Sequence, residues 1–384
     1  PLDLVCRDGV YHVVGDGMHE RTDGNIRDNG VPEDPVNTLG YLKTFFTWMP
    51  RISEALDLDE KKREKWLEIA ENLAPYPKGT IREIQENPTL WKEVDVKLED
   101  LLPEEMLDKE IYYDEGIGGK WSFHFPGNVM QIYPGNAIGL GSAPEELEVA
   151  RNTVQIHALV ENALGELEYR KALEEAEFAD KDNANNLLFN SNGELENGEA
   201  YSNGMESGGV KNPHFYKAGA FNASNLSCLF FTAAVRVGYA PEIIWKEMRD
   251  MILNRGIPNG FLKENPHGIE QLNTIPDAIQ EMMLQSCEGM IRIFPVWPRA
   301  EHPNAFFRNF RAWGGLEVSA ALKDGEVERV SILSHKGHPC RVENPWPGKS
   351  VKVSYEYGRP DEVHFGEYLN IELYKEEHAE LFRI

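Results

Sequence analysis

Residues 267–298 read HGIEQLNTIPDAIQEMMLQSCEGMIRIFPVWP, and the pattern of this stretch changes sharply along its length. Apolar residues recur at spacings of three and four from Ile275 to Met282, which predicts an amphipathic helix with one buried face. After Gly289 the letters IRIFPVWP combine β-branched and aromatic residues with prolines, which favours extended chain. We therefore expect a domain boundary near residue 289.

Residues 1–288, on the N-terminal side of this boundary, are predicted to be mainly helical. Residues 39–56 and 60–73 carry apolar side chains three and four apart, and together they predict a helical hairpin. Residues 144–164 predict another helix, with two glutamates in its first turn. Residues 165–215 are acidic and rich in Asn and Gly, so we expect an insertion that runs over the surface. Helices joined by long loops, without alternating strands, indicate an all-α layer.

Residues 289–384, on the C-terminal side, show a different period. The segments LEVSAAL, VERVSIL and VKVSYEY alternate apolar and polar residues, and turn-forming residues separate them. This pattern predicts a C-terminal antiparallel β domain of the sandwich type.

The composition limits the classes of ligand and partner. The chain has 384 residues, 41% of them hydrophobic, with a formal net charge of -25 and an isoelectric point near 4.9. Because phosphate binding needs a basic face, we expect no nucleic-acid partner and no anionic membrane surface. A neutral, hydroxyl-rich ligand fits this charge better. No apolar run approaches the roughly 20 residues of a membrane helix, so no membrane insertion is expected.

The motifs of metal, nucleotide and redox sites are not found in the sequence. The four cysteines are widely spaced, and HExxH, CxxC, GxGxxG and Walker-type patterns do not occur. We therefore predict no metal and no cofactor. The opening PLDLVCRDGVYHVV resembles strand from the middle of a domain, so an N-terminal portion of the same protein is expected to precede it.

Glu270 is the first catalytic candidate, because it lies in a polar loop just before the helix of the opening stretch. His267 and Gln271 flank it and are candidates for substrate binding. A second acidic candidate is Glu115, together with Asp114, in the loop IYYDEGIGGKW. Nearby aromatic residues, Trp121 included, could raise the pKa of such an acid and stack on a sugar ring. Ordinary turn chemistry is the alternative for this loop.

Asn37 has two interpretations as well, because it can cap the helix that begins near Thr38 or bind ligand. His157 lies within a predicted helix, where a packed core histidine is the simpler reading.

The junction MMLQS…GMIRIFPVWP…FRAWGGLEVSAALKDG, together with YPGN at 133–136, resembles glycoside hydrolase family 95. That family contains α-L-fucosidases and related α-L-galactosidases, and the likeness is strongest from about Glu281 to Gly325. It implies an (α/α)6 barrel-type helical toroid, of which this chain could hold only part, followed by a β domain. It also implies a bacterial protein exported to the periplasm or the medium.

The resemblance assigns roles to individual positions. Glu270 aligns with a family aspartate that helps to activate the attacking water, although its neighbours differ from the family pattern. His124 and Asn128 match parts of a histidine-rich segment before YPGN and would donate hydrogen bonds to sugar hydroxyls. Glu20, in MHERT, would lie in the cleft. The family's general acid lies upstream of the first residue of this chain.

Three functions are therefore compared. The leading hypothesis is an inverting glycoside hydrolase that removes a terminal α-L-fucose-like sugar from an oligo- or polysaccharide, with one carboxyl group as acid and another as base. A non-catalytic carbohydrate-binding protein on the same scaffold is the second. A polysaccharide lyase is the third and would need a Tyr/His pair, for which Tyr112, Tyr113 and His124 are candidates.

Overall fold

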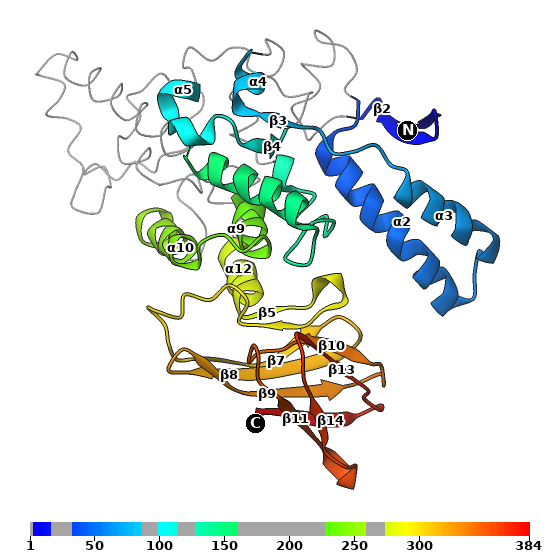
Figure 1. Ribbon diagram of the computed structural model, residues 1–384, viewed down its shortest axis with the longest axis vertical. Coiled ribbons are helices and arrows are strands. Elements are labelled where there is room, and N and C mark those ends of the chain that lie inside the picture. Colours follow the sequence, from blue (N-terminus) through cyan, green and yellow to red (C-terminus); the bar gives the residue numbers. More distant parts are fainter. Residues whose placement is uncertain (1–2, 17–32, 87–97, 114–126, 160–226, 259–272) are drawn as a thin grey trace, which may run out of the picture. The chain divides into compact units, whose positions relative to one another are not determined.

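A computed structural model describes residues 3–16, 33–86, 98–113, 127–159, 227–258 and 273–384. The chain forms two compact units (Figure 1). Unit 1 comprises Pro1–Val237 and Lys246–Ile275, and unit 2 comprises Gly238–Trp245 and Pro276–Ile384.

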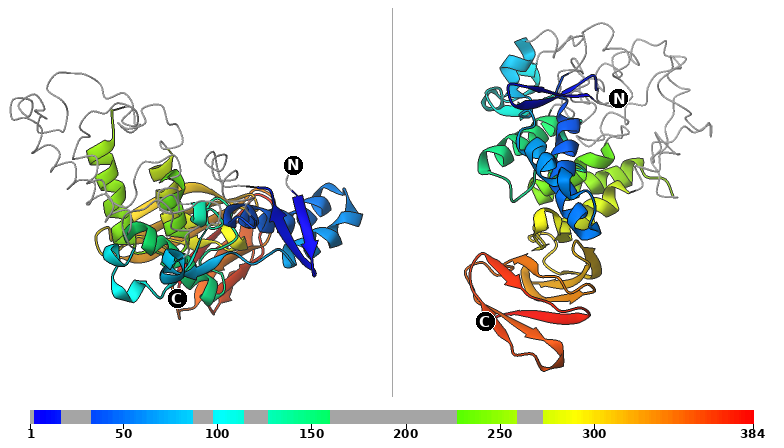
Figure 2. Two further views of the ribbon diagram at one scale, coloured as in Figure 1. Left: turned by 90° about the horizontal axis from the view of Figure 1, so that it is seen from above. Right: turned by 90° about the vertical axis from the view of Figure 1, so that its right-hand side faces the viewer.

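A helical hairpin is the longest helical feature of the described part of unit 1. Helix α2 spans Val36–Leu56 and packs against α3, Arg63–Glu71, as the apolar spacing predicts (Figure 2). The chain leaves α2 through Asp57, whose left-handed backbone lets its N–H donate to the last turn of the helix. Arg63 then donates to the Oγ and the carbonyl oxygen of Ser53, at 2.7 and 3.1 Å. These bonds fix the start of α3 on the buried side of α2.

Short strands and helices make up much of the remaining described part of unit 1. Strands β1 (Asp3–Arg7) and β2 (Val10–Val14) form an antiparallel hairpin. Strands β3 (Lys78–Thr80) and β4 (Glu110–Tyr112) pair across a long separation in sequence. The helical elements are α4 (Ile81–Glu86), α5 (Leu98–Leu101), the 3-10 turn η4 (Gly127–Val129), a helix over 144–159, α9 (Ser227–Arg236), α10 (Pro241–Arg255) and α12 (Thr274–Met283), the last two shared with unit 2.

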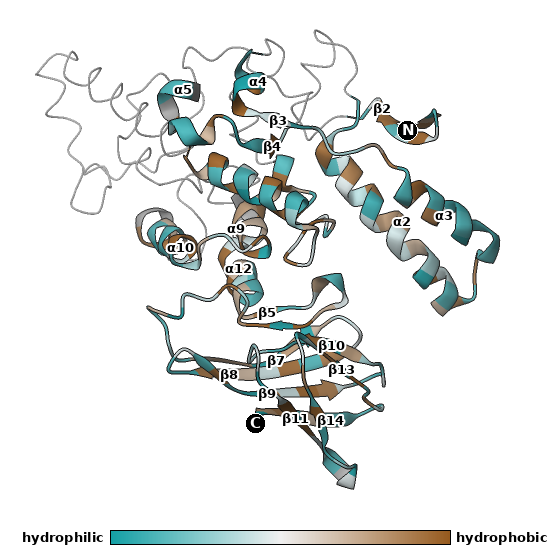
Figure 3. Ribbon diagram, in the orientation of Figure 1, coloured by the Kyte–Doolittle hydropathy of each residue, from teal (hydrophilic) through white to brown (hydrophobic). Residues whose placement is uncertain are grey.

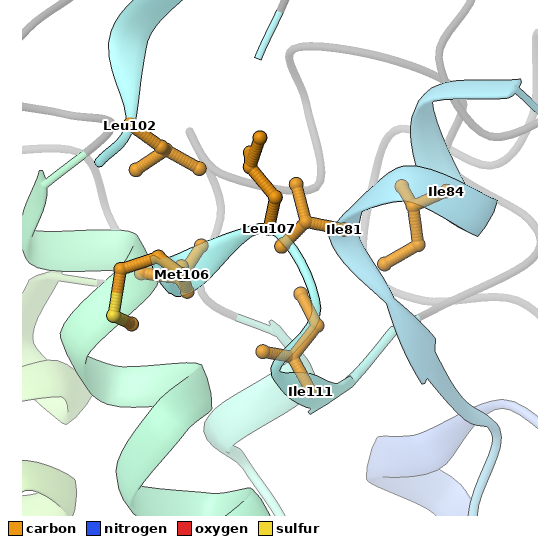
Figure 4. Close-up of a cluster of buried hydrophobic side chains, with 7 residues drawn as sticks. Ile81, Ile84, Leu102, Met106, Leu107 and Ile111 are labelled. Carbon is orange, nitrogen blue, oxygen red and sulfur yellow. The ribbon is translucent and has the colours of Figure 1, made fainter. Parts of the chain in front are cut away.

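An apolar cluster holds the β3–β4 pair and its neighbours together. Side chains from α4, from the segment before β4 and from the helix over 144–159 meet in it (Figure 4). Its buried members are Ile81, Ile84, Leu102, Met106, Leu107, Ile111 and Ile156. Burial of side chains of this size stabilises a fold by about 1.5–3 kcal/mol each. The cluster therefore fixes β4, which carries Tyr112 into the candidate site.

Unit 2 is built on a six-stranded antiparallel sheet with the strand order β12-β11-β14-β9-β8-β7. Its strands are β7 (Ala305–Ala312), β8 (Leu316–Lys323), β9 (Glu326–Ser334), β11 (Val351–Tyr355), β12 (Glu362–His364) and β14 (Glu377–Arg383). Residues of β8 alternate between buried and half-exposed, as the period of two predicts. The edge strand β7 carries a register shift between Phe307 and Phe310, a feature that discourages edge-to-edge pairing.

Two shorter ladders complete the described strands of unit 2. Strand β10 (Cys340–Glu343) pairs with β13 (Tyr368–Ile371), and β5 (Leu284–Gln285) pairs with β6 (Arg292–Ile293). The β10–β13 pair buries alternate residues, and Trp346, just after β10, donates from its indole N–H to the Val327 carbonyl at 2.6 Å. This bond connects the pair to the six-stranded sheet.

The expected mainly α fold, an (α/α)6-type toroid with a sandwich appended, is wrong. In the described residues seven α-helices have both ends defined, and they occur beside a six-stranded antiparallel sheet. Two of them, α4 and α5, have only six and four residues. The pair β1–β2 precedes the first described helix, and the paired strands β3 and β4 lie between helices, so the described helices do not follow one another as a ring of helical pairs. The antiparallel strands after residue 289 agree with the sequence pattern.

Arg359 makes a partly buried ion pair that supports the sheet of unit 2. Its guanidinium donates to Glu377 at 3.0 Å and to Glu362 at 2.9 Å, and it lies 3.9 Å from the centre of the Tyr355 ring. Glu377 is only 6% exposed. Loss of the guanidinium would therefore leave a buried carboxylate without its cation.

We predict that Arg359→Ala lowers the free energy of unfolding by about 1–3 kcal/mol, because it leaves the buried Glu377 carboxylate without its charged donor. Urea titration followed by circular dichroism measures the change. Arg311→Ala is the matched control: Arg311 pairs with Glu317 at 3.2 Å, but its side chain is 67% exposed, so its loss should cost less than about 1 kcal/mol. Equal effects of the two substitutions would contradict the prediction.

Candidate functional site

Two of the predicted site residues, Asn37 and Asn128, lie in the described part of the chain, and both are in unit 1. Asn37 is in the first turn of α2, and Asn128 is the central residue of η4. The other candidates lie outside the described residues: Glu20, Glu115, Trp121, His124, His267, Glu270 and Gln271. The site is therefore built from the surroundings of Asn128 and Asn37.

The side-chain amide of Asn128 joins two segments that are distant in sequence. Asn128 is 3% exposed, and its Nδ2 donates to the carbonyl oxygen of Tyr112 at 2.9 Å. Its Oδ1 therefore faces Nε2 of His157, which is 2% exposed. An amide oxygen only accepts hydrogen bonds, so Nε2 of His157 must carry the proton. The histidine is a buried packed residue, as its helical position predicts.

The helix over 144–159 supports both partners of Asn128. The backbone N–H of Tyr112 donates to Oγ1 of Thr153 at 2.9 Å, and the same hydroxyl donates to the Val149 carbonyl at 2.7 Å. Asn152 adds a bond from its Nδ2 to the carbonyl of Glu110 at 3.2 Å. Because His157 lies on the same helix, one rigid element positions β4 and the imidazole together.

Helix α2 covers the segment that follows Asn128. A Cβ atom at Gly40 would lie only 2.5 Å from Cβ of Gln131, so only glycine allows this approach of helix and turn. Thr44, one helical turn further on, donates from its hydroxyl to the carbonyl of Gly135. Gln131 in turn donates from Nε2 to the Asn128 carbonyl at 2.8 Å. The face of α2 that carries Asn37, Gly40 and Thr44 thus lies against residues 128–135.

Three buried polar atoms in this part of unit 1 have no hydrogen-bond partner: Asn37 Oδ1, Tyr76 OH and Gln131 Oε1. For Gln131 the assignment of oxygen and nitrogen is fixed, since Nε2 is already used as a donor to Asn128. Asn37 is 8% exposed and Gln131 is fully buried. Buried polar atoms are usually satisfied by protein, water or ligand. The side-chain amide oxygens of Asn37 and Gln131 can therefore accept hydrogen bonds from hydroxyl groups.

The phenols of Tyr76 and Tyr112 are held in their protonated form. The rings of Tyr76 and Tyr112 meet edge to face with centroids 5.7 Å apart. Burial raises the pKa of both phenols above the ordinary value, and nearby Glu146 raises it further. Both remain donors of hydrogen bonds at neutral pH rather than bases.

Chemically, the Asn128 cluster is neutral. We use this name for Asn37, Tyr112, Asn128, Gln131, Thr153 and His157. Its polar groups are amides, a hydroxyl, a phenol and an imidazole, and the hydrogen bonds that join them involve no carboxylate among the described residues. Such a set can hold and orient a neutral polar ligand or a neighbouring loop. The sequence pattern did not single out Gln131, although it lies only three residues after Asn128.

A separate group, His12, Glu33 and Asp34, brings three potential metal-ligand atoms within 4.8 Å of one another. The Nδ1 of His12 lies 2.6 Å from Asp34, and Glu33 pairs with Arg7. Asp34 also accepts a hydrogen bond from the backbone N–H of Val13 at 2.7 Å. These contacts form a hydrogen-bonded network that ties β1–β2 to the residues just before α2.

The cysteines carry no reactive signature in the described residues. Cys287 and Cys340 are buried, and burial raises the pKa of the Cys340 thiol to about 12. A thiol of that pKa is a poor nucleophile.

In comparisons with known proteins, the chain matches no protein-family model and no curated protein. Across the described ranges, no helix combines the length and the apolar character needed to cross a bilayer.

We predict that Gly40→Ala destabilises unit 1 by about 1–3 kcal/mol, because the added methyl overlaps Gln131 in a packed interior. The sign is diagnostic, since the same change at an open helix position stabilises by roughly 1 kcal/mol. Thermal unfolding measures it, with Thr47→Ala at an exposed position of α2 as the control. A stabilised Gly40→Ala variant would show that α2 does not approach Gln131.

Proposed function

We propose that this protein is a glycoside hydrolase that removes a terminal α-L-fucose-like sugar from an oligo- or polysaccharide with inversion. The observation that carries the proposal is the hydrogen bond from Asn128 to the Tyr112 carbonyl. This bond links Tyr112 and Asn128, which lie on either side of the segment 114–126 in the sequence. That segment contains Glu115, Trp121 and His124. Candidate residues for sugar binding and proton transfer are thus connected to a rigid, neutral support.

The charge of the support favours a neutral ligand. Sugars of the fucose type present hydroxyl groups and one apolar face, so they are recognised by amides, tyrosines and aromatic rings. The Asn128 cluster offers groups of this kind, including the amide oxygens of Asn37 and Gln131. The net charge of -25 disfavours phosphorylated or sulphated ligands in the same way.

The chemistry needs two carboxyl groups on opposite sides of the scissile bond, typically about 6.5–9.5 Å apart in inverting enzymes. In the proposal Glu270 is the base that activates water. The acid that protonates the leaving oxygen is Glu115 or a residue supplied by an N-terminal portion of the protein. The described cluster contributes no carboxylate, so its role is to position and not to transfer protons.

A non-catalytic carbohydrate-binding protein is the second candidate. Asn128 uses both ends of its amide inside the protein, one on Tyr112 and one on His157. It therefore supports a binding surface rather than supplying a free group to a reacting sugar. The polysaccharide lyase is disfavoured at Tyr112, because a lyase base must lose its proton while burial raises the pKa of this phenol.

We predict that Glu270→Gln lowers kcat for an aryl α-L-fucoside or α-L-galactoside by about 10²–10⁴-fold, because general base catalysis is lost while the shape of the side chain is kept. Glu301→Gln, at an exposed position of unit 2, is the control and should turn over normally. Product anomers followed by NMR report inversion. Undiminished turnover in Glu270→Gln would overturn the mechanism, and binding without turnover by the parent protein would favour the second candidate.

A further inference from the structure

Helix α2 exposes a row of large apolar side chains to solvent. Tyr41, Phe45, Ile52 and Leu56 are 36%, 52%, 45% and 62% exposed, and Leu58, just after the helix, is 59% exposed. Apolar segments recur along the helix in Figure 3. Single exposed apolar residues are ordinary, but a contiguous row of this kind marks an interaction surface.

These residues lie on one side of α2. At 3.6 residues per turn, the positions 41, 45, 48, 52 and 56 fall within roughly a quarter of the circumference of the helix. The opposite side contains the buried Pro50 and Ser53. We call the row of Tyr41, Phe45, Trp48, Ile52 and Leu56 the α2 stripe. It runs for about 22 Å at 1.5 Å per residue.

Charge is sparse along the α2 stripe. In its 21 residues α2 has three charged side chains, Lys43, Arg51 and Glu54, although 27% of the whole chain is charged. By helical geometry Lys43 and Glu54 point away from the stripe. Arg51 lies at its rim, 5.0 Å from the Trp48 ring centre. Depletion of charge with enrichment of aromatic residues and Arg is the composition of a protein–protein interface.

We propose that the α2 stripe is the interface of a homodimer in which α2 packs antiparallel against α2 of a second copy. In an antiparallel pair centred between Trp48 and Met49, each aromatic residue of the N-terminal half meets an aliphatic residue of the partner's C-terminal half. Phe45 then faces Ile52 of the partner subunit, and Tyr41 faces Leu56 of the partner subunit. A parallel pair would instead place aromatic against aromatic and aliphatic against aliphatic. The stripe is thus self-complementary about a two-fold axis, as an isologous interface requires.

The exposed area is sufficient for such a dimer. For side chains of about 150–250 Å2, the exposed fractions of the four stripe residues above and Leu58 correspond to roughly 500 Å2 of apolar surface per copy. A standard interface buries about 800 Å2 per partner, of which about 56–65% is apolar. The α2 stripe and Leu58 together therefore supply about the apolar share of a standard interface.

Sedimentation velocity on the full chain between about 1 and 100 µM tests the proposal. We expect a dimer whose population rises with concentration, and we expect Phe45→Glu and Ile52→Glu to be monomers with unchanged circular dichroism. The matched control is Leu253→Glu on α10, where an equally exposed leucine, at 66%, lies outside the α2 stripe. A monomer at every concentration, or a dimer that survives both stripe substitutions, would overturn the proposal.

Cysteine cross-linking tests the antiparallel direction without disturbing the apolar surface by charge. In a Cys6→Ser background, which removes the exposed native thiol, Trp48→Cys should form an intermolecular disulfide under mild oxidation. Leu56→Cys should not, because the two copies of residue 56 lie at opposite ends of an antiparallel pair. Cross-linking of Leu56→Cys with no reaction of Trp48→Cys would exclude the antiparallel pair. If neither variant reacted in a protein that sediments as a dimer, the interface would lie elsewhere.

Discussion

The side-chain amide of Asn128 is the constraint on which the described site of unit 1 depends. It bonds β4 through the Tyr112 carbonyl and the helix over 144–159 through His157, and its backbone carbonyl accepts from Gln131 under α2. Each of these groups is buried, and a buried polar group without a partner costs several kcal/mol relative to water. No member of the Asn128 cluster can therefore move alone without cost. The three elements are positioned together or not at all.

The same constraint bears on the proposed reaction, which needs charged groups. Carboxylates buried among amides and tyrosines would be desolvated, and their pKa values would rise. The absence of carboxylates from the Asn128 cluster therefore fits a positioning role in the proposal. In this arrangement Asn128 positions its neighbours, and the candidate proton-transfer groups Glu115 and Glu270 remain the ones to be tested by substitution.

Local periodicity predicted the elements that local sequence controls. The three–four spacing identified α2, α3 and α12, and alternation identified β8 and β9, because one buried face imposes these periods. It could not reveal the β3–β4 pair, which joins Lys78–Thr80 to Glu110–Tyr112 with three residues on each side. Strands this short have no period to detect.

The toroid was wrong for a related reason. Its prediction extended a likeness over residues 281–325 to a region where the order of elements is not fixed by local pattern. The candidate site shows the same limit. Asn128 was singled out from a motif, but its partner His157 lies 29 residues away, and that pairing depends on tertiary structure. The burial of Gln131 depends likewise on the close approach of Gly40, which is a tertiary contact.

The position of the proton on the His157 ring is the most direct test of the hydrogen bonds around Asn128. Long-range 1H–15N correlation spectra distinguish the two neutral tautomers of an imidazole from its charged form, and a His157→Gln variant identifies the signal among the 11 histidines. We predict that Nε2 of His157 carries a proton that is donated to Asn128. A ring protonated on Nδ1 alone would contradict the hydrogen-bond pattern on which the site is built.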